Sequence, residues 1–320
     1  MNDAPQIKPP PKAKSTLRSR LAAVWDSDLA WNFRHSPVAI AAATTTLLIF
    51  IAAFLAPWIA PQNAFDPGAV RLDDGFLKPL EVGSTGITHV FGTDSQGRDL
   101  LSAILYGTRV SLIVGFASVG FSMVLGVSLG LIAGFVGGRV DALIMRVADV
   151  QLSFPAILIA LLVFGVGRGL IHPTQHERMA VIVLIIAIGL SHWAQYARTV
   201  RGATLVERNK EYVQAARVMG RTSGAIMGSH VLPNVIGPVL VIATINLALA
   251  VIEEATLSFL GVGVPPTQPS LGTLIRVGQQ FLFSGERWIL FFPAAALIIL
   301  ALAVNLLGDW LRDALNPRLK

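Results

Sequence analysis

The chain has 320 residues, of which 53% are hydrophobic and only 14% are charged, and its mean hydropathy is +0.64. A soluble domain usually carries about 25% charged residues, so this composition excludes an ordinary soluble protein and predicts an integral membrane protein. The formal net charge is +6, but the basic residues lie beside apolar segments, which favours topology and lipid contact over nucleic-acid binding. Cysteine is absent, which excludes disulfides and thiolate metal sites.

The N-terminal segment differs in composition from the rest of the chain. Residues 1–37 are charged and contain the proline-rich stretch IKPPPK, so we expect a disordered cytoplasmic arm. The first apolar run begins near Val38 and is long enough to span a membrane, which argues against a cleavable signal peptide. Residues 38–106 are expected to form the first transmembrane helix and an external loop. We expect residues 60–107, which are polar and turn-rich, to cap the membrane domain as a small loop structure.

Six segments are apolar over a length sufficient to cross a bilayer. A transmembrane helix needs about 20 apolar residues to cross about 30 Å of hydrocarbon, and each segment offers about that number. We therefore predict an all-α integral membrane protein with six transmembrane helices. The predicted spans are residues 38–59, 110–135, 150–167, 179–197, 234–254 and 288–308.

Lysine and arginine are distributed unevenly between the two sides that these spans define. The two tails and the loops 136–149 and 198–233 hold 17 basic residues, whereas the three alternate loops hold seven. Cytoplasmic loops carry an excess of lysine and arginine. We therefore predict that both termini, the tail 310–320 and the loop 198–233 lie in the cytoplasm.

Small residues recur on one side of the second span. Gly126, Gly130 and Gly134 are spaced by four residues, so they form a stripe that permits close approach of another helix. The stripe is equally consistent with packing inside this subunit and with contact to a partner subunit.

A histidine pair follows the third span. His172 and His176 have the i, i+4 spacing of helical metal ligands, and Glu177 is adjacent. Pro173 argues against a regular helix that carries both histidines, and the sequence places no third ligand. We expect a solvated loop here and no metal site.

The loop between the fourth and fifth spans contains a short amphipathic helix. This helix is too polar to span the membrane, so we expect it to be a docking surface for a partner outside the membrane. Tyr212, Ala215, Ala216 and Met219 are spaced i, i+3, i+4 and i+7, so they are predicted to share one face, whereas Glu211 lies on another side. Two adjacent alanines leave a shallow surface that a partner protein can approach closely.

Turn signals follow this helix. Gly220 stands where a left-handed C-cap is expected. Thr222 or Ser223 can cap a second short helix, which we expect Pro233 to end.

Polar residues in the fifth span are candidates for a transport pathway or gate. Asn246 lies near its middle, and Glu253 and Glu254 lie at its outer end. One of the carboxylates could attract a positively charged amino group at an outer gate. The alternative is an interfacial helix end at which water solvates both carboxylates.

The amphipathic loop resembles the EAA loop of ABC-importer permeases. Ala215, Ala216, Gly220, Leu232 and Pro233 match that pattern at the right spacing. Two positions depart from it, because Gln214 replaces the family glutamate and His230 replaces an isoleucine.

Further segments resemble the same family in the same order. The matching segments are 91–94 (FGTD) with 97–99 (GRD), 107–112 (GTRVSL), 254–261 (EATLSFLG) with 265–272, and 305–309 (NLLGD) with 311–313. Together they are similar to the C-type permease subunit of a dipeptide or oligopeptide ABC importer.

The resemblance implies a type I ABC importer permease fold, with its transmembrane core at 107–309, in the bacterial cytoplasmic (inner) membrane. It implies a homologous second permease subunit, two cytoplasmic ATPase subunits and an extracytoplasmic peptide-binding protein as partners. A phosphate-binding P-loop is absent from the sequence, so ATP and Mg²⁺ belong to the partner subunits, and we expect no cofactor in this chain and no enzymatic activity.

The implied ATPase-coupling residues are Glu211, Tyr212, Ala215, Ala216, Met219, Gly220, Leu232 and Pro233. Nickel, glutathione or another small solute could replace the peptide within the same class. An ion-coupled secondary transporter and a membrane scaffold are the alternatives from other classes.

Overall fold

The computed structural model describes residues 28–315 except 67, 69, 266 and 269. Most of the predicted N-terminal arm and the last five residues of the predicted C-terminal tail therefore lie outside the described residues. Two prolines of the segment 265–272, Pro266 and Pro269, lie outside them as well.

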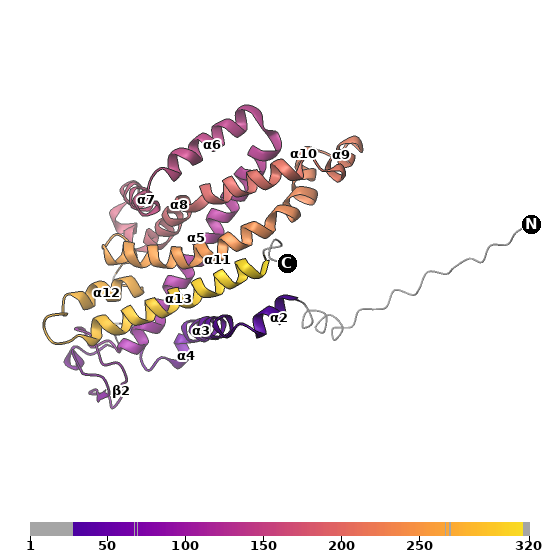
Figure 1. The fold of residues 1–320 in the computed structure, drawn as a ribbon. Coiled ribbons are helices and arrows are strands. Elements are labelled where there is room, and N and C mark those ends of the chain that lie inside the picture. Colours follow the sequence, from indigo (N-terminus) through magenta and orange to yellow (C-terminus); the bar gives the residue numbers. More distant parts are fainter. Residues whose placement is uncertain (1–27, 67, 69, 266, 269, 316–320) are drawn as a thin grey trace, which may run out of the picture.

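The described residues form a bundle of long helices with one small hairpin (Figure 1). The helices are α2 (Asp28–Arg34), α3 (Pro37–Phe54), α4 (Ala56–Ile59), α5 (Leu100–Val136), α6 (Gly138–Leu152), α7 (Ala156–Leu170), α8 (His176–Glu207), α9 (Glu211–Val218), α10 (Ser223–Ile226), α11 (Leu232–Phe259), α12 (Leu271–Gln279) and α13 (Trp288–Leu315). Single turns of 3₁₀-helix lie at Leu72–Asp74 and Pro173–Gln175, and a π-helical turn lies at Met227–Val231. The strands β1 (Glu81–Val82) and β2 (Thr88–His89) are antiparallel.

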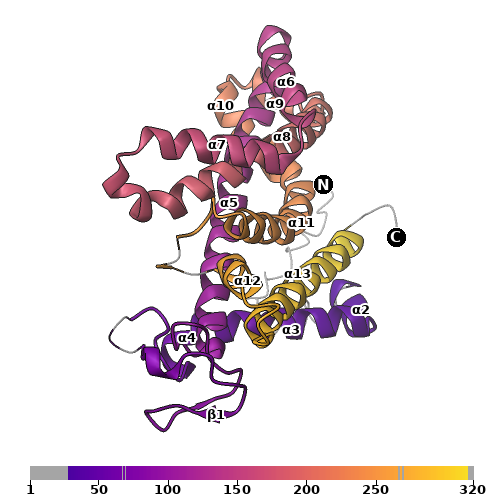
Figure 2. The ribbon, with the colours of Figure 1, turned by 90° about the vertical axis from the view of Figure 1, so that its left-hand side faces the viewer.

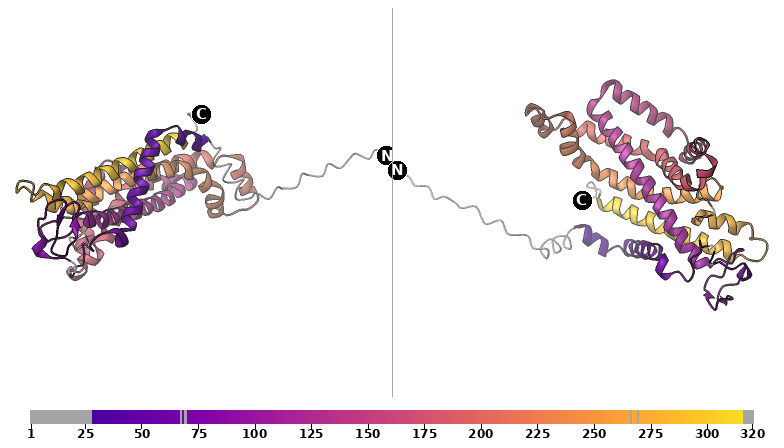
Figure 3. Two further views of the ribbon diagram at one scale, coloured as in Figure 1. Left: turned by 90° about the horizontal axis from the view of Figure 1, so that it is seen from below. Right: turned by 180° about the vertical axis from the view of Figure 1, so that it is seen from behind.

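The long helices lie side by side and connect two ends of the molecule. Helix α5 packs closely against α8, α11 packs against both of them, and α13 packs against α11 and α3. Helices α9 and α10 and the C-terminal end of α13 lie toward one end, whereas α12 and the hairpin lie toward the other (Figures 1 and 2). The same arrangement is visible from below and from behind in Figure 3. The all-helical prediction is confirmed, apart from the short hairpin, which no strand pattern in the sequence indicates.

Two of the predicted spans, 110–135 and 179–197, are parts of longer helices. Helix α5 begins at Leu100, because the side chain of Asp99 caps it by accepting a hydrogen bond from the Ser102 amide at 2.7 Å. With 37 residues, α5 is about 55 Å long, well over the thickness of hydrocarbon in a bilayer. Helix α8 has 32 residues and continues to Glu207, so it extends into the loop predicted at 198–233.

The third predicted span, 150–167, is wrong as a single helix. Helix α6 ends at Leu152, α7 begins at Ala156, and the two helices meet at an angle of 101°. Pro155 stands immediately before α7, where it cannot continue the hydrogen-bond ladder of α6. The described residues therefore contain five helices long and apolar enough to span a membrane, or six when α6 and α7 count as one broken span.

Ion pairs tie α6 to α8. Both guanidinium nitrogens of Arg201 that face Asp141 lie 2.6 Å from its carboxylate oxygens, and Arg198 pairs with Asp149 at 2.6 Å. Each arginine comes from α8 and each aspartate from α6. The polar side of α6 is thereby directed at the neighbouring helix.

The last part of the predicted disordered arm is helical. Helix α2 covers Asp28–Arg34, within the predicted range 1–37. Aromatic contacts hold it, because Phe33 packs edge-to-face on Trp310 of α13 at 5.1 Å between ring centroids. A contact partner almost 280 residues away explains why the local composition did not indicate a helix.

Small residues occupy the interior and many large apolar residues face outward. Ala53, Ala187, Ala194 and Ala197 are fully buried. Leucine, valine and isoleucine side chains are exposed along α3, α6, α7 and α13. Moving an apolar side chain from lipid to the protein interior gives no hydrophobic stabilisation, so large apolar residues can face the lipid. Small residues in the interior allow the helices to pack closely.

Candidate coupling and transport sites

Helix α9 projects beyond the apolar helices at one end of the molecule (Figure 1). Val213 and Ala216 are buried against the ends of α5, α8 and α11, whereas Val218 and Met219 are 89% and 72% exposed. Ala215 is also exposed. The predicted common face is therefore divided, because Ala216 packs inward and Ala215 and Met219 point outward. Val218 joins the exposed apolar surface and was missed, since it falls outside the spacing used for the prediction.

Gly220 ends α9 as the sequence predicts. Its φ is +75°, a left-handed conformation that a side chain opposes. The Arg221 amide donates to the Ala216 carbonyl at 3.1 Å, and the Gly220 amide donates to the Arg217 carbonyl at 2.9 Å. These two bonds form a Schellman motif, which turns the chain toward α10.

The segment after this turn differs in part from the prediction. Thr222 caps α10 by accepting a hydrogen bond from the Ala225 amide at 3.4 Å, as expected. Pro233 does not end a short helix, because it lies in the first turn of α11, where proline needs no amide partner. A π-helical turn joins α10 to α11, so Leu232 and Pro233 belong to one helical segment that extends to Phe259.

A polar network fixes the position of α9 relative to α8 and α11. The Tyr212 hydroxyl donates to the Glu207 carboxylate, whose other oxygen accepts from Lys210 at 2.6 Å. Asn234 donates to the Tyr212 oxygen at 3.1 Å. Loss of hydration, reinforced by the bond to Glu207, raises the pKa of Tyr212 to about 12.

Two arginines anchor this loop on the end of α5. Arg208 donates to the Gly134 carbonyl at 2.8 Å. The Arg217 guanidinium lies 5.0 Å from the centroid of the Phe135 ring, within cation–π distance. Neither contact could be predicted from local sequence, because the partners are more than 70 residues apart in the chain.

The glycine stripe packs within this chain. A side-chain Cβ at Gly126 would lie 2.4 Å from the Trp193 carbonyl oxygen, and one at Gly130 would lie 2.5 Å from that of Ala197. At Gly134 a Cβ would lie 2.7 Å from Thr204. The three glycines thus let α5 approach α8, which decides between the two interpretations in favour of packing inside the subunit.

Glu254 joins three elements of the bundle. Its carboxylate has no exposed surface and accepts hydrogen bonds from Ser111 of α5 at 2.5 Å and from Ser258 of its own helix at 2.7 Å. The Ser111 hydroxyl also accepts from the Leu271 amide at the start of α12. The alternative in which water solvates this carboxylate is therefore wrong, and a role in the gate stays a prediction.

Two other polar groups lie at membrane depth. Glu253 accepts a hydrogen bond from His192 of α8 at 3.0 Å, a pair that sequence spacing could not indicate. Asn246 is buried, and its side-chain amide lies beside the hydroxyl of Tyr196 in α8. Its role in the pathway stays a prediction.

The two histidines flank the 3₁₀ turn at Pro173–Gln175, and His176 is the first residue of α8. His176 contacts the Ile171 carbonyl at 2.8 Å, and His172 contacts the Thr174 hydroxyl at 3.0 Å. Within residues 28–315 as described, no three His, Asp or Glu side chains gather as a metal site would require.

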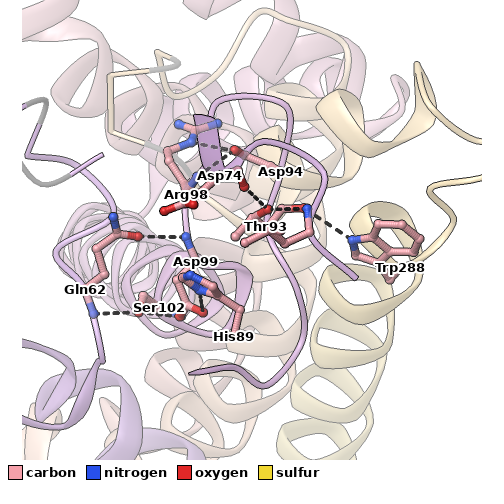
Figure 4. Close-up of polar contacts among 10 residues, drawn as sticks. Gln62, Asp74, His89, Thr93, Asp94, Arg98, Asp99, Ser102 and Trp288 are labelled. Carbon is pink, nitrogen blue, oxygen red and sulfur yellow. Dashed lines mark hydrogen bonds and ion pairs between the residues drawn. The ribbon is translucent and has the colours of Figure 1, made fainter. Parts of the chain in front are cut away.

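A polar cap, residues 60–99, covers the other end of the bundle (Figures 2 and 4). Gly97 turns the chain with φ +78°, and Asp94 accepts hydrogen bonds from the Gln96 and Arg98 amides and from the Arg98 side chain. The Asp99 carboxylate contacts His89 at 2.9 Å and Ser102 at 2.6 Å. The FGTD and GRD segments therefore build this turn.

Further bonds attach the cap to the helices. Trp288 of α13 donates to the Thr93 carbonyl at 3.2 Å, and Gln62 accepts from the Asp99 amide at 2.9 Å (Figure 4). The Ser84 amide, 2.8 Å from Asp74, holds the pKa of that carboxyl below its usual value. The cap is thus attached by hydrogen bonds to α13 and to α5.

Fold and site together define a multi-pass membrane subunit with the architecture of an ABC importer permease. Residues 126–320 match the family described as binding-protein-dependent transport system inner membrane component. Residues 25–79 match the N-terminal transmembrane domain of oligopeptide transport permease C. The chain belongs to the binding-protein-dependent family of inner-membrane transport components.

Relatives of similar length are named as permeases of peptide or glutathione transport systems. The chain is 36% identical to the di/tripeptide transport system permease protein DppC of Pseudomonas aeruginosa, over 100% of this chain and 98% of the relative. It is 41% identical to a putative peptide transport system permease protein of Brucella suis over 86% of each chain. It is 36% identical to the glutathione transport system permease protein GsiD of Pectobacterium atrosepticum over 90% of each.

The fold is also similar to a solved structure. A chain of the MetNI methionine ABC transporter, in an inward-facing conformation, superposes with a TM-score of 0.51 and 21% identity. The match covers 67% of this chain and 96% of the other. The predicted ABC importer fold is confirmed.

Proposed function

We propose that this chain is a permease subunit that forms half of the translocation pathway of an ATP-driven importer of di- or oligopeptides. The names of the relatives from Pseudomonas aeruginosa and Brucella suis support the substrate class. The partners are a homologous permease subunit, two cytoplasmic ATPase subunits and an extracytoplasmic peptide-binding protein. ATP and Mg²⁺ bind to the ATPase subunits, and this chain needs no cofactor of its own.

The exposed apolar surface of α9 is the observation that carries the coupling mechanism. Val218 and Met219 project from a short helix that is braced by Glu207, Arg208 and Arg217. An apolar surface outside the membrane-spanning helices is costly in water unless a partner covers it. We assign that surface to contact with an ATPase.

The mechanism follows from how α9 is attached. The π-helical turn and α11 form one helical segment with α10, so a push on α9 and α10 is transmitted directly to a membrane-spanning helix. Closure of the ATPase subunits on ATP would move this segment and open the pathway toward the binding protein. Hydrolysis would reverse the movement.

Val218→Asp tests this coupling in a reconstituted complex. A carboxylate at the contact would be desolvated without a partner, so association with the ATPase should weaken at least tenfold, or about 1.4 kcal/mol. Peptide uptake and ATP hydrolysis stimulated by the loaded binding protein should both fall, while membrane insertion is unchanged. Val82→Asp in the hairpin is the matched control, since Val82 is also exposed but lies at the opposite end.

Wild-type coupling in Val218→Asp would refute the assignment of α9.

Glutathione is a second candidate substrate because of the relative from Pectobacterium atrosepticum. Uptake assays with labelled dipeptide, tripeptide and glutathione on the same proteoliposomes discriminate between them. Uptake of glutathione without uptake of peptides would replace the peptide assignment.

A further inference from the structure

A hollow of about 600 Å³ opens on the cap, beside the loop that follows α11. Its described lining residues are Ala64, Phe65, Val70, Leu72, Gln96, Arg98 and Thr267. Four of them are apolar, and Arg98 is the only charged side chain among those described. The hollow therefore combines an apolar wall with a single cation.

Arg98 is held in place with part of its guanidinium unused. The residue is 9% exposed, and its Nε donates to Asp94 at 2.7 Å. The other Asp94 oxygen accepts from the Gln96 and Arg98 amides, which fixes the carboxylate. No described residue accepts a hydrogen bond from the two terminal nitrogens of Arg98.

The buried carboxylates of the cap are already occupied. Asp74 accepts from the amide and the hydroxyl of Ser84, and Asp99 accepts from Ser102 and contacts His89. The terminal nitrogens of Arg98 are therefore available to a ligand from outside the chain. A guanidinium edge presents two N–H groups in a planar fork, which matches the two oxygens of a carboxylate.

We infer that this hollow receives an acidic side chain, with an apolar neighbour, from a protruding loop of the extracytoplasmic binding protein. The inference rests on the proposed function, which places the cap outside the membrane and brings a binding protein to that face. The hollow is open at the surface of the cap, and such a shape suits a loop of a docked protein better than a small ligand, which is normally enclosed. Partial desolvation of Arg98 strengthens its attraction for a carboxylate.

Leu72→Asp tests the inference without removing Arg98. Leu72 lies on the hollow and is 78% exposed, so an aspartate there repels an incoming carboxylate and competes for Arg98. We expect the peptide-loaded binding protein to bind the complete complex in nanodiscs at least tenfold more weakly. Leu80→Asp is the matched control, because Leu80 is 71% exposed on the same cap but does not line the hollow. Its affinity should stay within twofold of wild type.

Arg98→Lys is a second variant that keeps the charge and removes the planar fork. It should also weaken binding, and the affinity of the wild-type complex should fall as salt rises. Melting temperatures of all variants in the complex identify any that fail to fold, and a folded Leu72→Asp or Arg98→Lys complex suffices for the test.

Equal affinities for Leu72→Asp and Leu80→Asp, or wild-type affinity in Arg98→Lys, would overturn the inference. A labelled peptide offered without binding protein distinguishes the source of the carboxylate. Peptide binding that depends on Arg98, with docking unaffected, would assign the hollow to substrate and contradict docking. Failure of the proposed function is a separate result, since it is a lack of peptide uptake by the wild-type complex.

Discussion

At Glu254, a fully buried carboxylate accepts hydrogen bonds from serine hydroxyls of α5 and α11. Glu254→Ala leaves both hydroxyls without their acceptor, so we expect a loss of about 3 kcal/mol in the free energy of unfolding, at about 1.5 kcal/mol for each bond. Glu254→Gln keeps one acceptor oxygen and should lose about half as much. Unfolding of the purified complex in detergent measures both.

The control for this change is Glu177→Gln. Glu177 is exposed in the first turn of α8, where its charge contributes less than about 1 kcal/mol through the helix dipole. Equal unfolding midpoints for Glu254→Ala and wild type would show that the carboxylate does not tie α5, α11 and α12 together.

Tyr212 links α9 to α8 and has a perturbed acidity. Its pKa in the folded protein is about 12, above the usual value of 10.0, so the folded state holds the proton more tightly. The stabilisation is complete below pH 10 and is lost as the pH rises through the folded pKa. The pH dependence of phenolate absorbance measures this pKa. We expect the wild-type protein to show a component that titrates near pH 12, and we expect Tyr212→Phe to lack it. A lost component near pH 10 would contradict the contact with Glu207.

At the scale of elements, the closeness of α5 and α8 depends on the glycine stripe. A Cβ at Gly130 would lie 2.5 Å from a backbone oxygen of α8, whereas a Cβ at Gly120 of the same helix meets nothing within 4 Å. Gly130→Ala should force the helices apart and cost about 1–3 kcal/mol. Gly120→Ala should be neutral or slightly stabilising, because alanine favours helix by about 1 kcal/mol over glycine. Thermal unfolding in detergent compares the two, and equal effects would contradict the packing.

The break between α6 and α7 shows how a local signal and a tertiary contact act together. Pro155 determines where α7 begins. The angle of 101° depends on the neighbours, since Asp141 and Asp149 hold α6 against Arg201 and Arg198 of α8. A proline in the sequence therefore predicts where a helix ends, but it does not predict the direction that the next helix takes.

At the scale of the whole molecule, the two ends differ in a way that labelling can test. The cap with Gln96 and the loop with Asn209 lie at opposite ends of the bundle, and both residues are exposed. Because the chain has no cysteine, single cysteines can be introduced at either position. A cysteine at Gln96 should react with an impermeant reagent in intact cells, and one at Asn209 should react only after permeabilisation. The reverse pattern would refute the proposed orientation.

Much of the architecture could be predicted because its causes are local. Apolar length predicts five of the spans, and Gly220 and Thr222 produce the turn between α9 and α10 through their own backbone and side-chain chemistry. The third span was misplaced because hydropathy does not detect a bend. Helix α2 and the hairpin were missed, since α2 depends on a distant aromatic contact and each strand has only two residues.

The sequence by itself determined the class of protein, the approximate spans and the helix–turn–helix loop, because composition, periodicity and capping signals are properties of neighbouring residues. Only the tertiary structure decided which polar groups meet. Ser111 and Glu254 are 143 residues apart, and His192 and Glu253 are 61 apart, yet each pair forms a hydrogen bond. Tertiary packing also turned Ala216 inward and Met219 outward, because the orientation of α9 depends on the helices beneath it.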